Sequence, residues 1–168
     1  DESFRDRFLR ESELAASIDH PNIVPIYEAG ATEDLLFIAM RYVAGRDLKV
    51  RLQHGRMDPG DAIGIVAQVA SALDAAHARG LVHRDVKPSN VLLDTGARPD
   101  GSDHVYLADF GITKRVSDEA GLGDDGRLLG SIDYVAPEQI AGDELDGRAD
   151  VYSLGCVLYE CLTGQPPF

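Results

Sequence analysis

Cysteine is scarce in this chain of 168 residues, where Cys156 and Cys161 are the two present. They stand five positions apart in an apolar helical run, which places their side chains about 140° apart around the helix axis. Side chains that diverge in this way cannot form a disulfide. We therefore predict buried free thiols, as expected for a protein of the reducing cytoplasm.

Basic residues are also few. The chain has 16 lysines and arginines against 29 aspartates and glutamates, which gives a formal net charge of −13. A nucleic-acid-binding surface needs clustered lysine and arginine, so this balance argues against a nucleic-acid partner. The five histidines have no metal-ligand spacing with one another or with the carboxylates, and we predict no zinc site.

Long hydrophobic runs are missing as well, since no stretch of about 18 apolar residues occurs. The acidic opening DESFRDRF does not have the pattern of a signal peptide. We therefore expect no membrane segment in this chain and a cytoplasmic location, with any membrane anchor lying outside it. A composition of 44% hydrophobic and 27% charged residues is that of one globular domain.

The first third of the chain has the pattern of a helix followed by two strands. Residues Phe4 to Ile18 carry apolar side chains at helical spacing and place Glu11 beside that face. Strands are predicted at Ile23 to Tyr27 and at Leu35 to Val43, separated by a turn at AGATED.

A long helix is predicted to begin after Asp58, because this N-cap residue is followed by Pro59. It should end near Arg79, since Gly80 is a typical stop. Its predicted apolar stripe is Ile63, Val66, Ala70, Leu73 and His77. On that stripe His77 has the character of a packed histidine rather than a catalytic one.

Three short motifs follow in order along the rest of the chain. They are HRDVKPSN (residues 83–90), Asp109-Phe110-Gly111 and Ala136-Pro137-Glu138. Phosphoryl transfer needs a carboxylate near the acceptor hydroxyl, a cation for the phosphate and oxygen ligands for Mg²⁺. Asp85, Lys87, Asn90 and Asp109 supply these groups. Each tripeptide alone is a weak signal, but the ordered set indicates a protein kinase.

On these motifs the chain resembles the Ser/Thr protein kinase family, most closely the eukaryotic-like kinases of bacteria. The resemblance implies an α+β, partial protein-kinase-like fold, in which residues 1–43 form a small-lobe remnant with the hinge and residues 44–168 a large-lobe portion. Family members carry a Gly-rich loop and a strand lysine ahead of the helix with Glu11. Neither precedes Glu11 in this chain, because its first glycine is Gly30 and its first lysine is Lys49. We therefore expect an internal portion of a longer kinase.

The resemblance also implies the roles of the catalytic residues. Asp85 would orient or accept the proton of a Ser or Thr hydroxyl, and Lys87 would bridge Asp85 and the γ-phosphate. A lysine at this place is typical of the Ser/Thr branch. Asn90 and Asp109 would ligate Mg²⁺ through oxygen atoms.

ATP would be held by residues from both parts of the chain. Glu11 would pair with the strand lysine, Met40 would be the gatekeeper, and the backbone of Arg41 and Val43 would contact the adenine at the hinge. Leu92 would support the adenine from below. Arg41 replaces the acidic residue common at its position.

Three further residues are implied to be regulatory. Arg84 would be neutralised by a phosphorylated residue of the activation segment, residues 109–138. Ser117 is the one hydroxyl residue between Lys114 and Gly130. Ser131 stands where the family has the threonine of Gly-Thr-x-x-Tyr.

Other residues are implied to be architectural. His83 and Phe110 would pack together below the helix with Glu11. Asp150 would open a buried helix and cap the backbone of the loop that carries Asp85. The residues between Leu93 and Asp109 form a longer connection than usual, and their Gly, Pro and Asp content predicts a hairpin loop.

The function predicted from the sequence is transfer of the γ-phosphoryl group of ATP to Ser or Thr hydroxyls of protein substrates. A pseudokinase scaffold is the main alternative. It is disfavoured because both acids, Asp85 and Asp109, are present. A small-molecule phosphotransferase is the least favoured, because such relatives lack Lys87 followed by the Asp-Phe-Gly and Ala-Pro-Glu motifs.

Overall fold

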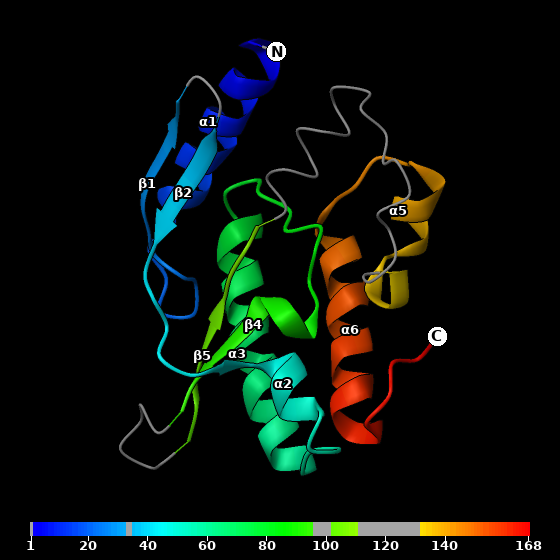
Figure 1. The fold of residues 1–168 in the computed structure, drawn as a ribbon. Coiled ribbons are helices and arrows are strands. Elements are labelled where there is room, and N and C mark those ends of the chain that lie inside the picture. Colours follow the sequence, from blue (N-terminus) through cyan, green and yellow to red (C-terminus); the bar gives the residue numbers. More distant parts are fainter. Residues whose placement is uncertain (1, 33–34, 96–101, 111–131) are drawn as a thin grey trace.

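The computed structural model describes residues 2–32, 35–95, 102–110 and 132–168. Its elements are α1 (Glu2–Ala16), β1 (Ile26–Ala31), β2 (Leu36–Met40), β3 (Arg46–Asp47), α2 (Leu48–Leu52), α3 (Pro59–His77), η1 (Pro88–Asn90), β4 (Val91–Asp94), β5 (His104–Leu107), η2 (Ile132–Tyr134), α5 (Pro137–Ala141) and α6 (Gly147–Thr163). Figure 1 shows α1 beside the β1–β2 hairpin at one end and the larger, mainly helical part at the other.

Helix α1 forms where the sequence predicts it and buries the expected face. Phe8, Ala15 and the residue Ile18 just beyond the helix are buried, and Ser12 lies on the same face. Glu11 is half-buried beside them. The helix packs against β1.

The first predicted strand is wrong in its position. Strand β1 begins at Ile26 rather than Ile23, and the predicted turn residues Ala29 to Ala31 pair with β2. The reason is that Ile23 and Val24 bind the other sheet: Ile23 bridges Leu107, and the Val24 amide donates to the Leu107 carbonyl at 3.0 Å. This contact joins the two parts of the molecule.

Helix α3 has the predicted ends but a different buried face. Asp58 caps it by accepting from the Gly60 amide at 2.8 Å, and Gly80 adopts a φ of +73° after it. The buried side chains are Ala62, Ile65, Val69, Ala72, Leu73 and Ala76. The predicted stripe was one position off for most of its length, and Ile63 is 61% exposed. The helix is apolar on most sides, so the periodicity of the sequence did not single out the face that packs against α6 and β5.

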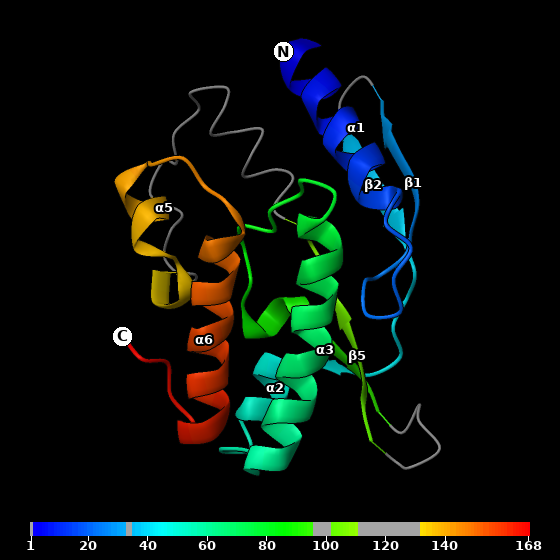
Figure 2. The same cartoon turned by 180° about the vertical axis from the view of Figure 1, so that it is seen from behind.

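The core of the larger part lies between α3, α6 and the β3–β4–β5 sheet, and Figures 1 and 2 both show α3 beside α6. Cys156 and Cys161 are buried and free, as predicted. Burial raises the pKa of the Cys161 thiol to about 11. Within the part of the chain that the structure describes, no helix has the length and apolarity needed to span a bilayer.

The predicted hairpin is confirmed by the antiparallel pairing of β4 with β5, in which Val91 faces Leu107 and Asp94 faces His104. Strand β3 pairs with the other edge of β4. Gly45 leads into β3 with its α-carbon against the β4 backbone, because an added Cβ would lie 2.0 Å from the Leu93 carbonyl oxygen. The hairpin brings Ala108 and Phe110, which follow β5, into contact with His83 in the loop that carries Asp85.

Candidate active site

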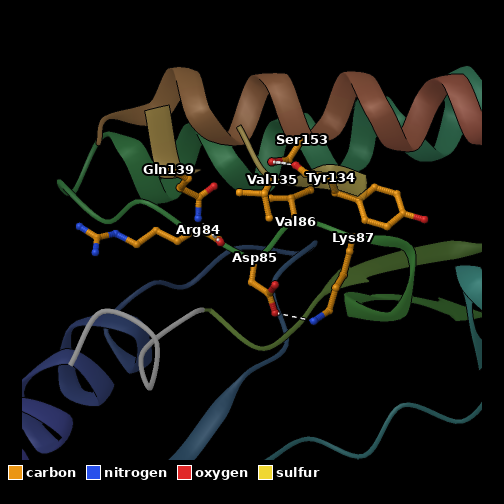
Figure 3. A pocket seen from close by; sticks show the side chains of 8 residues that line it. All are labelled: Arg84, Asp85, Val86, Lys87, Tyr134, Val135, Gln139 and Ser153. Carbon is orange, nitrogen blue, oxygen red and sulfur yellow. Dashed lines mark hydrogen bonds and ion pairs between the residues drawn. The ribbon is translucent and has the colours of Figure 1, made fainter. Parts of the chain in front are cut away.

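The loop between α3 and β4 brings three of the predicted catalytic residues together. The Lys87 ammonium lies 2.7 Å from Asp85 Oδ2. Asn90 Nδ2 donates to the Asp85 carbonyl at 2.8 Å and to Asp85 Oδ2 at 3.1 Å. In Figure 3 the side chains of Asp85 and Lys87 point toward each other. The carboxylate is therefore held in place by a cation and an amide while its side chain remains 14% exposed.

A buried carboxylate at the start of α6 fixes the backbone of this loop. Asp150 is 1% exposed and accepts from the amides of His83 and Arg84, both at 2.8 Å. Arg84 has a φ of +65°, a conformation that costs a non-glycine residue about 1–3 kcal/mol. The two hydrogen bonds offset this cost, and the predicted capping role of Asp150 is confirmed.

His77 also binds this carboxylate, because its Nε2 lies 2.7 Å from Asp150 Oδ2. Its side chain is 22% exposed, so His77 is a hydrogen-bonded support rather than an apolar core residue. Gly147 packs flat on the imidazole, where an added Cβ would lie 2.6 Å from Nδ1. Helices α3 and α6 thus meet at the base of the loop.

His83 is the buried centre of the loop. Its Nδ1 accepts from the Asp85 amide at 3.2 Å, so the ring proton resides on Nε2, which donates to the Ala108 carbonyl at 3.0 Å. The ring packs against Phe110 at a centroid distance of 4.6 Å, as the resemblance implied. Burial lowers the pKa of His83 below its ordinary 6.5, because desolvation disfavours the imidazolium.

This lowered pKa predicts an acid-sensitive contribution to stability. Below pH 6.5 the unfolded chain binds a proton at His83 that the folded chain rejects, so the free energy of unfolding should fall as the pH drops toward the folded pKa. The loss amounts to at most about 1.4 kcal/mol per pH unit. Urea unfolding of the wild type and of His83→Phe at several pH values measures this effect. The free energy of unfolding should fall more steeply with decreasing pH in the wild type. The same pH dependence in both proteins would contradict the prediction.

The two predicted magnesium ligands lie at the ends of connected elements. The Ala108 amide donates to the Asn90 carbonyl at 2.9 Å, which holds the end of β5 beside η1. Asp109 follows, exposed and with a φ of +55°. The Asn90 amide nitrogen donates to the Asp85 carbonyl, so Oδ1 is the side-chain atom that would face a metal ion as a ligand. An amide oxygen and a carboxylate fit Mg²⁺, which prefers oxygen donors. The described ranges contain no group of three or more His, Cys, Asp or Glu side chains placed to hold a metal ion.

The predicted hinge follows directly after β2, which ends at Met40. The Arg41 amide donates to the Pro25 carbonyl at 2.9 Å. The Arg41 guanidinium lies over the ring of Tyr106, 5.1 Å from its centroid, a cation–π contact. Tyr106 in turn faces Leu92 across the hairpin, and Val43 packs nearby. The Arg41 side chain therefore packs on the β4–β5 hairpin of the larger part.

Residues 132–141 form the other wall of the site. Tyr134 donates to Glu160 Oε2 at 2.5 Å, and the Tyr134 carbonyl accepts from the Ser153 hydroxyl at 2.7 Å. Gln139 Nε2 donates to the Arg84 carbonyl at 2.9 Å. Together with the loop these residues line the pocket of Figure 3, whose members are Arg84, Asp85, Val86, Lys87, Tyr134, Val135, Gln139 and Ser153.

Ser117 and Ser131 lie outside the described residues, as does Gly111 of the Asp-Phe-Gly motif.

Two contacts were not predicted from the sequence. They are the hydrogen bond from Gln139 to Arg84 and the stacking of Arg41 on Tyr106. Both join residues far apart in the chain. The one feature of the sequence that could have pointed to the Gln139 contact is a polar side chain directly after Ala-Pro-Glu.

Curated relatives cover the whole chain. Serine/threonine-protein kinase PknJ of Mycobacterium tuberculosis is 46% identical over 168 residues, which is 100% of this chain and 28% of PknJ. Serine/threonine-protein kinase PknD of the same organism is 47% identical over 166 residues, which is 98% of this chain and 24% of PknD. The chain thus spans about a quarter of the length of these relatives.

Solved kinase structures share the fold. The Mycobacterium tuberculosis PknI kinase domain matches with a TM-score of 0.78 at 38% identity, over 100% of this chain and 60% of that chain. Rad53 1-466 in complex with AMP-PNP matches with a TM-score of 0.78 at 30% identity, over 97% of this chain and 39% of that chain. The predicted α+β, partial kinase fold is confirmed. The family model for the protein kinase domain matches residues 1–168, and the chain belongs to the protein kinase family.

Proposed function

We propose that the chain carries the catalytic centre of an ATP-dependent protein serine/threonine kinase. The observation that supports this most strongly is the Asp85 carboxylate, which Lys87 approaches to 2.7 Å and Asn90 to 3.1 Å. The relatives PknJ and PknD are named serine/threonine-protein kinases. The proposed partners are proteins with Ser or Thr acceptors.

In this proposal Asp85 orients the acceptor hydroxyl and takes its proton as the oxygen attacks the γ-phosphorus, while the bond from that phosphorus to the β–γ bridging oxygen breaks and ADP leaves. Lys87 Nζ, already beside Asp85 Oδ2, would neutralise charge on the transferring phosphoryl group. Bound ATP with Mg²⁺ would supply that group and the metal charge that stabilises it. Asn90 and Asp109 would hold the metal through oxygen atoms.

We propose that the nucleotide lies between the hinge and the β4–β5 hairpin. The backbone of Arg41 and Val43 would contact the adenine, Met40 would close its inner side, and Leu92 would support it. The engagement of the Arg41 amide with Pro25 leaves the Arg41 carbonyl for this contact. Glu11 on α1 would pair with a strand lysine in the complete protein.

Arg84 is the proposed regulatory cation, with Ser117 and Ser131 as proposed activation-segment partners. The arginine side chain extends away from Asp85 and Lys87 in Figure 3. A phosphate on the segment would pair with it through charge and acceptor oxygens. This ion pair would order the activation segment next to Asp85.

The proposal is tested by incubating the complete protein with γ-labelled ATP, Mg²⁺ and a generic basic protein. Phosphoserine and phosphothreonine are the expected products after acid hydrolysis. Nucleotide binding without any transfer would favour the pseudokinase alternative. Label transferred to a small metabolite instead would favour the small-molecule phosphotransferase.

Asp109→Asn is expected to weaken Mg²⁺-dependent nucleotide binding, because it removes the charge from a proposed metal ligand. Titration calorimetry of the complete protein with an ATP analogue should show at least a tenfold weaker affinity at low Mg²⁺, recovered in part at high Mg²⁺. Asp143→Asn, at an exposed site next to α5, is the matched control. Equal affinity of Asp109→Asn and wild type across the Mg²⁺ range would contradict the assignment.

A further inference from the structure

Gln139 stands out among the residues around the catalytic loop because the proposed chemistry does not use it. It lies in α5, and its Nε2 donates to the Arg84 carbonyl at 2.9 Å, across 55 positions of sequence. The Gln139 side chain is half-buried in the wall of the pocket. Figure 3 shows its amide turned toward the backbone of Arg84.

The Arg84 carbonyl belongs to the peptide group that leads directly into Asp85. The nitrogen of this peptide, the Asp85 amide, donates to His83 Nδ1 at 3.2 Å. One residue earlier, the Arg84 amide donates to Asp150 Oδ1 at 2.8 Å. The peptide is thus held on both sides, and Gln139 supplies the hydrogen bond on its oxygen side.

This hydrogen bond matters because Arg84 has the unfavourable φ of +65°. Rotation about the Cα–C bond of Arg84 would turn its carbonyl away from Gln139 and would move the Asp85 backbone, and with it the carboxylate, relative to Lys87. A donor on the carbonyl oxygen opposes this rotation. Gln139 therefore acts on the orientation of Asp85 without contacting the reacting atoms.

Residues 132–141 connect this contact to the rest of the pocket. Tyr134 is tied to α6 at both its hydroxyl and its carbonyl. The backbone amide of Gln139 makes a further hydrogen bond within this segment, because it donates to the Ala136 carbonyl at 2.9 Å. A shift of this wall would be transmitted to Asp85 through the Gln139 side chain.

We propose that Gln139 is a positioning residue, which couples the wall formed by residues 132–141 to the catalytic carboxylate through the Arg84 carbonyl. This inference rests on the proposed kinase function for its effect on rate. Its structural part, control of the Arg84–Asp85 peptide, does not depend on that function.

The test compares variants of the complete protein by steady-state kinetics and thermal unfolding. Gln139→Met keeps the length of the side chain but removes the donor, and kcat should fall about three- to tenfold. The KM for ATP and the Tm should stay near wild type. Gln139→Lys restores an N–H donor and should recover kcat to within about threefold of wild type. Gln53→Met makes the same substitution at the exposed C-cap of α2, outside this wall, and is the matched control that should leave kcat unchanged.

Hydrogen exchange provides a readout that does not need activity. The Asp85 amide should exchange faster in Gln139→Met than in the wild type, because the peptide is released. If the wild type transfers no phosphate but this exchange still accelerates, the proposed function fails and the positioning role stands. An unchanged kcat and exchange rate in Gln139→Met would overturn the inference, as would a loss of kcat matched by a loss of Tm or of ATP affinity.

Discussion

Asp85→Asn in the complete protein is expected to slow phosphoryl transfer by roughly 10²- to 10⁴-fold with little change in nucleotide affinity. Asparagine has the size of aspartate and can still accept from Lys87, whose Nζ lies 2.7 Å from the carboxylate in the wild type. It cannot take the proton of an attacking hydroxyl. The loss should therefore appear in kcat and leave ATP binding intact.

Rates from a radiolabel assay and affinities from nucleotide titration separate these two effects. Asp74→Asn removes the same charge from an exposed position on α3 and is the matched control. Equal transfer by the wild type and by Asp85→Asn would show that the labelled product came from a contaminating kinase. In that case the pseudokinase alternative would become the better account.

Asp150→Ala is expected to have the largest effect on stability. The carboxylate is 1% exposed and accepts from the His83 and Arg84 amides and from His77 Nε2. Its removal leaves two backbone amides without an acceptor and should lower the free energy of unfolding by about 3–5 kcal/mol. Phosphoryl transfer should be lost as well, because the loop that carries Asp85 is no longer anchored.

Urea unfolding monitored by circular dichroism measures this loss, and Asp146→Ala is a useful comparison. Asp146 caps the same helix by accepting from the Arg148 amide at 2.9 Å, but it lies at the surface. Asp146→Ala should lower the urea concentration at the unfolding midpoint much less than Asp150→Ala does. Similar midpoints for the two variants would mean that Asp150 contributes no more to stability than an ordinary helix cap.

The motifs located most of the site because their residues are close in sequence. Asp85, Lys87 and Asn90 lie within six positions, and a tight loop necessarily brings them together. The spacing also predicted the ends of α3, since Asp58 and Gly80 act through local backbone geometry.

Long-range choices were harder to predict from the sequence. The segment at Ile23 pairs with Leu107 rather than with β2, and nothing local distinguishes the two partners. The face of α3 depends on where α6 lies, because the helix is apolar on most sides. Likewise, the acceptor of Gln139 is a backbone carbonyl 55 positions away, which no side-chain pattern encodes.

The most direct test of the account is a crystal structure of the complete protein with a non-hydrolysable ATP analogue, Mn²⁺ and an acceptor peptide. We expect anomalous density for the metal against Asn90 Oδ1 and the Asp109 carboxylate, and the acceptor hydroxyl within hydrogen-bond distance of Asp85. A metal bound elsewhere, or a hydroxyl held away from Asp85, would contradict the proposed site.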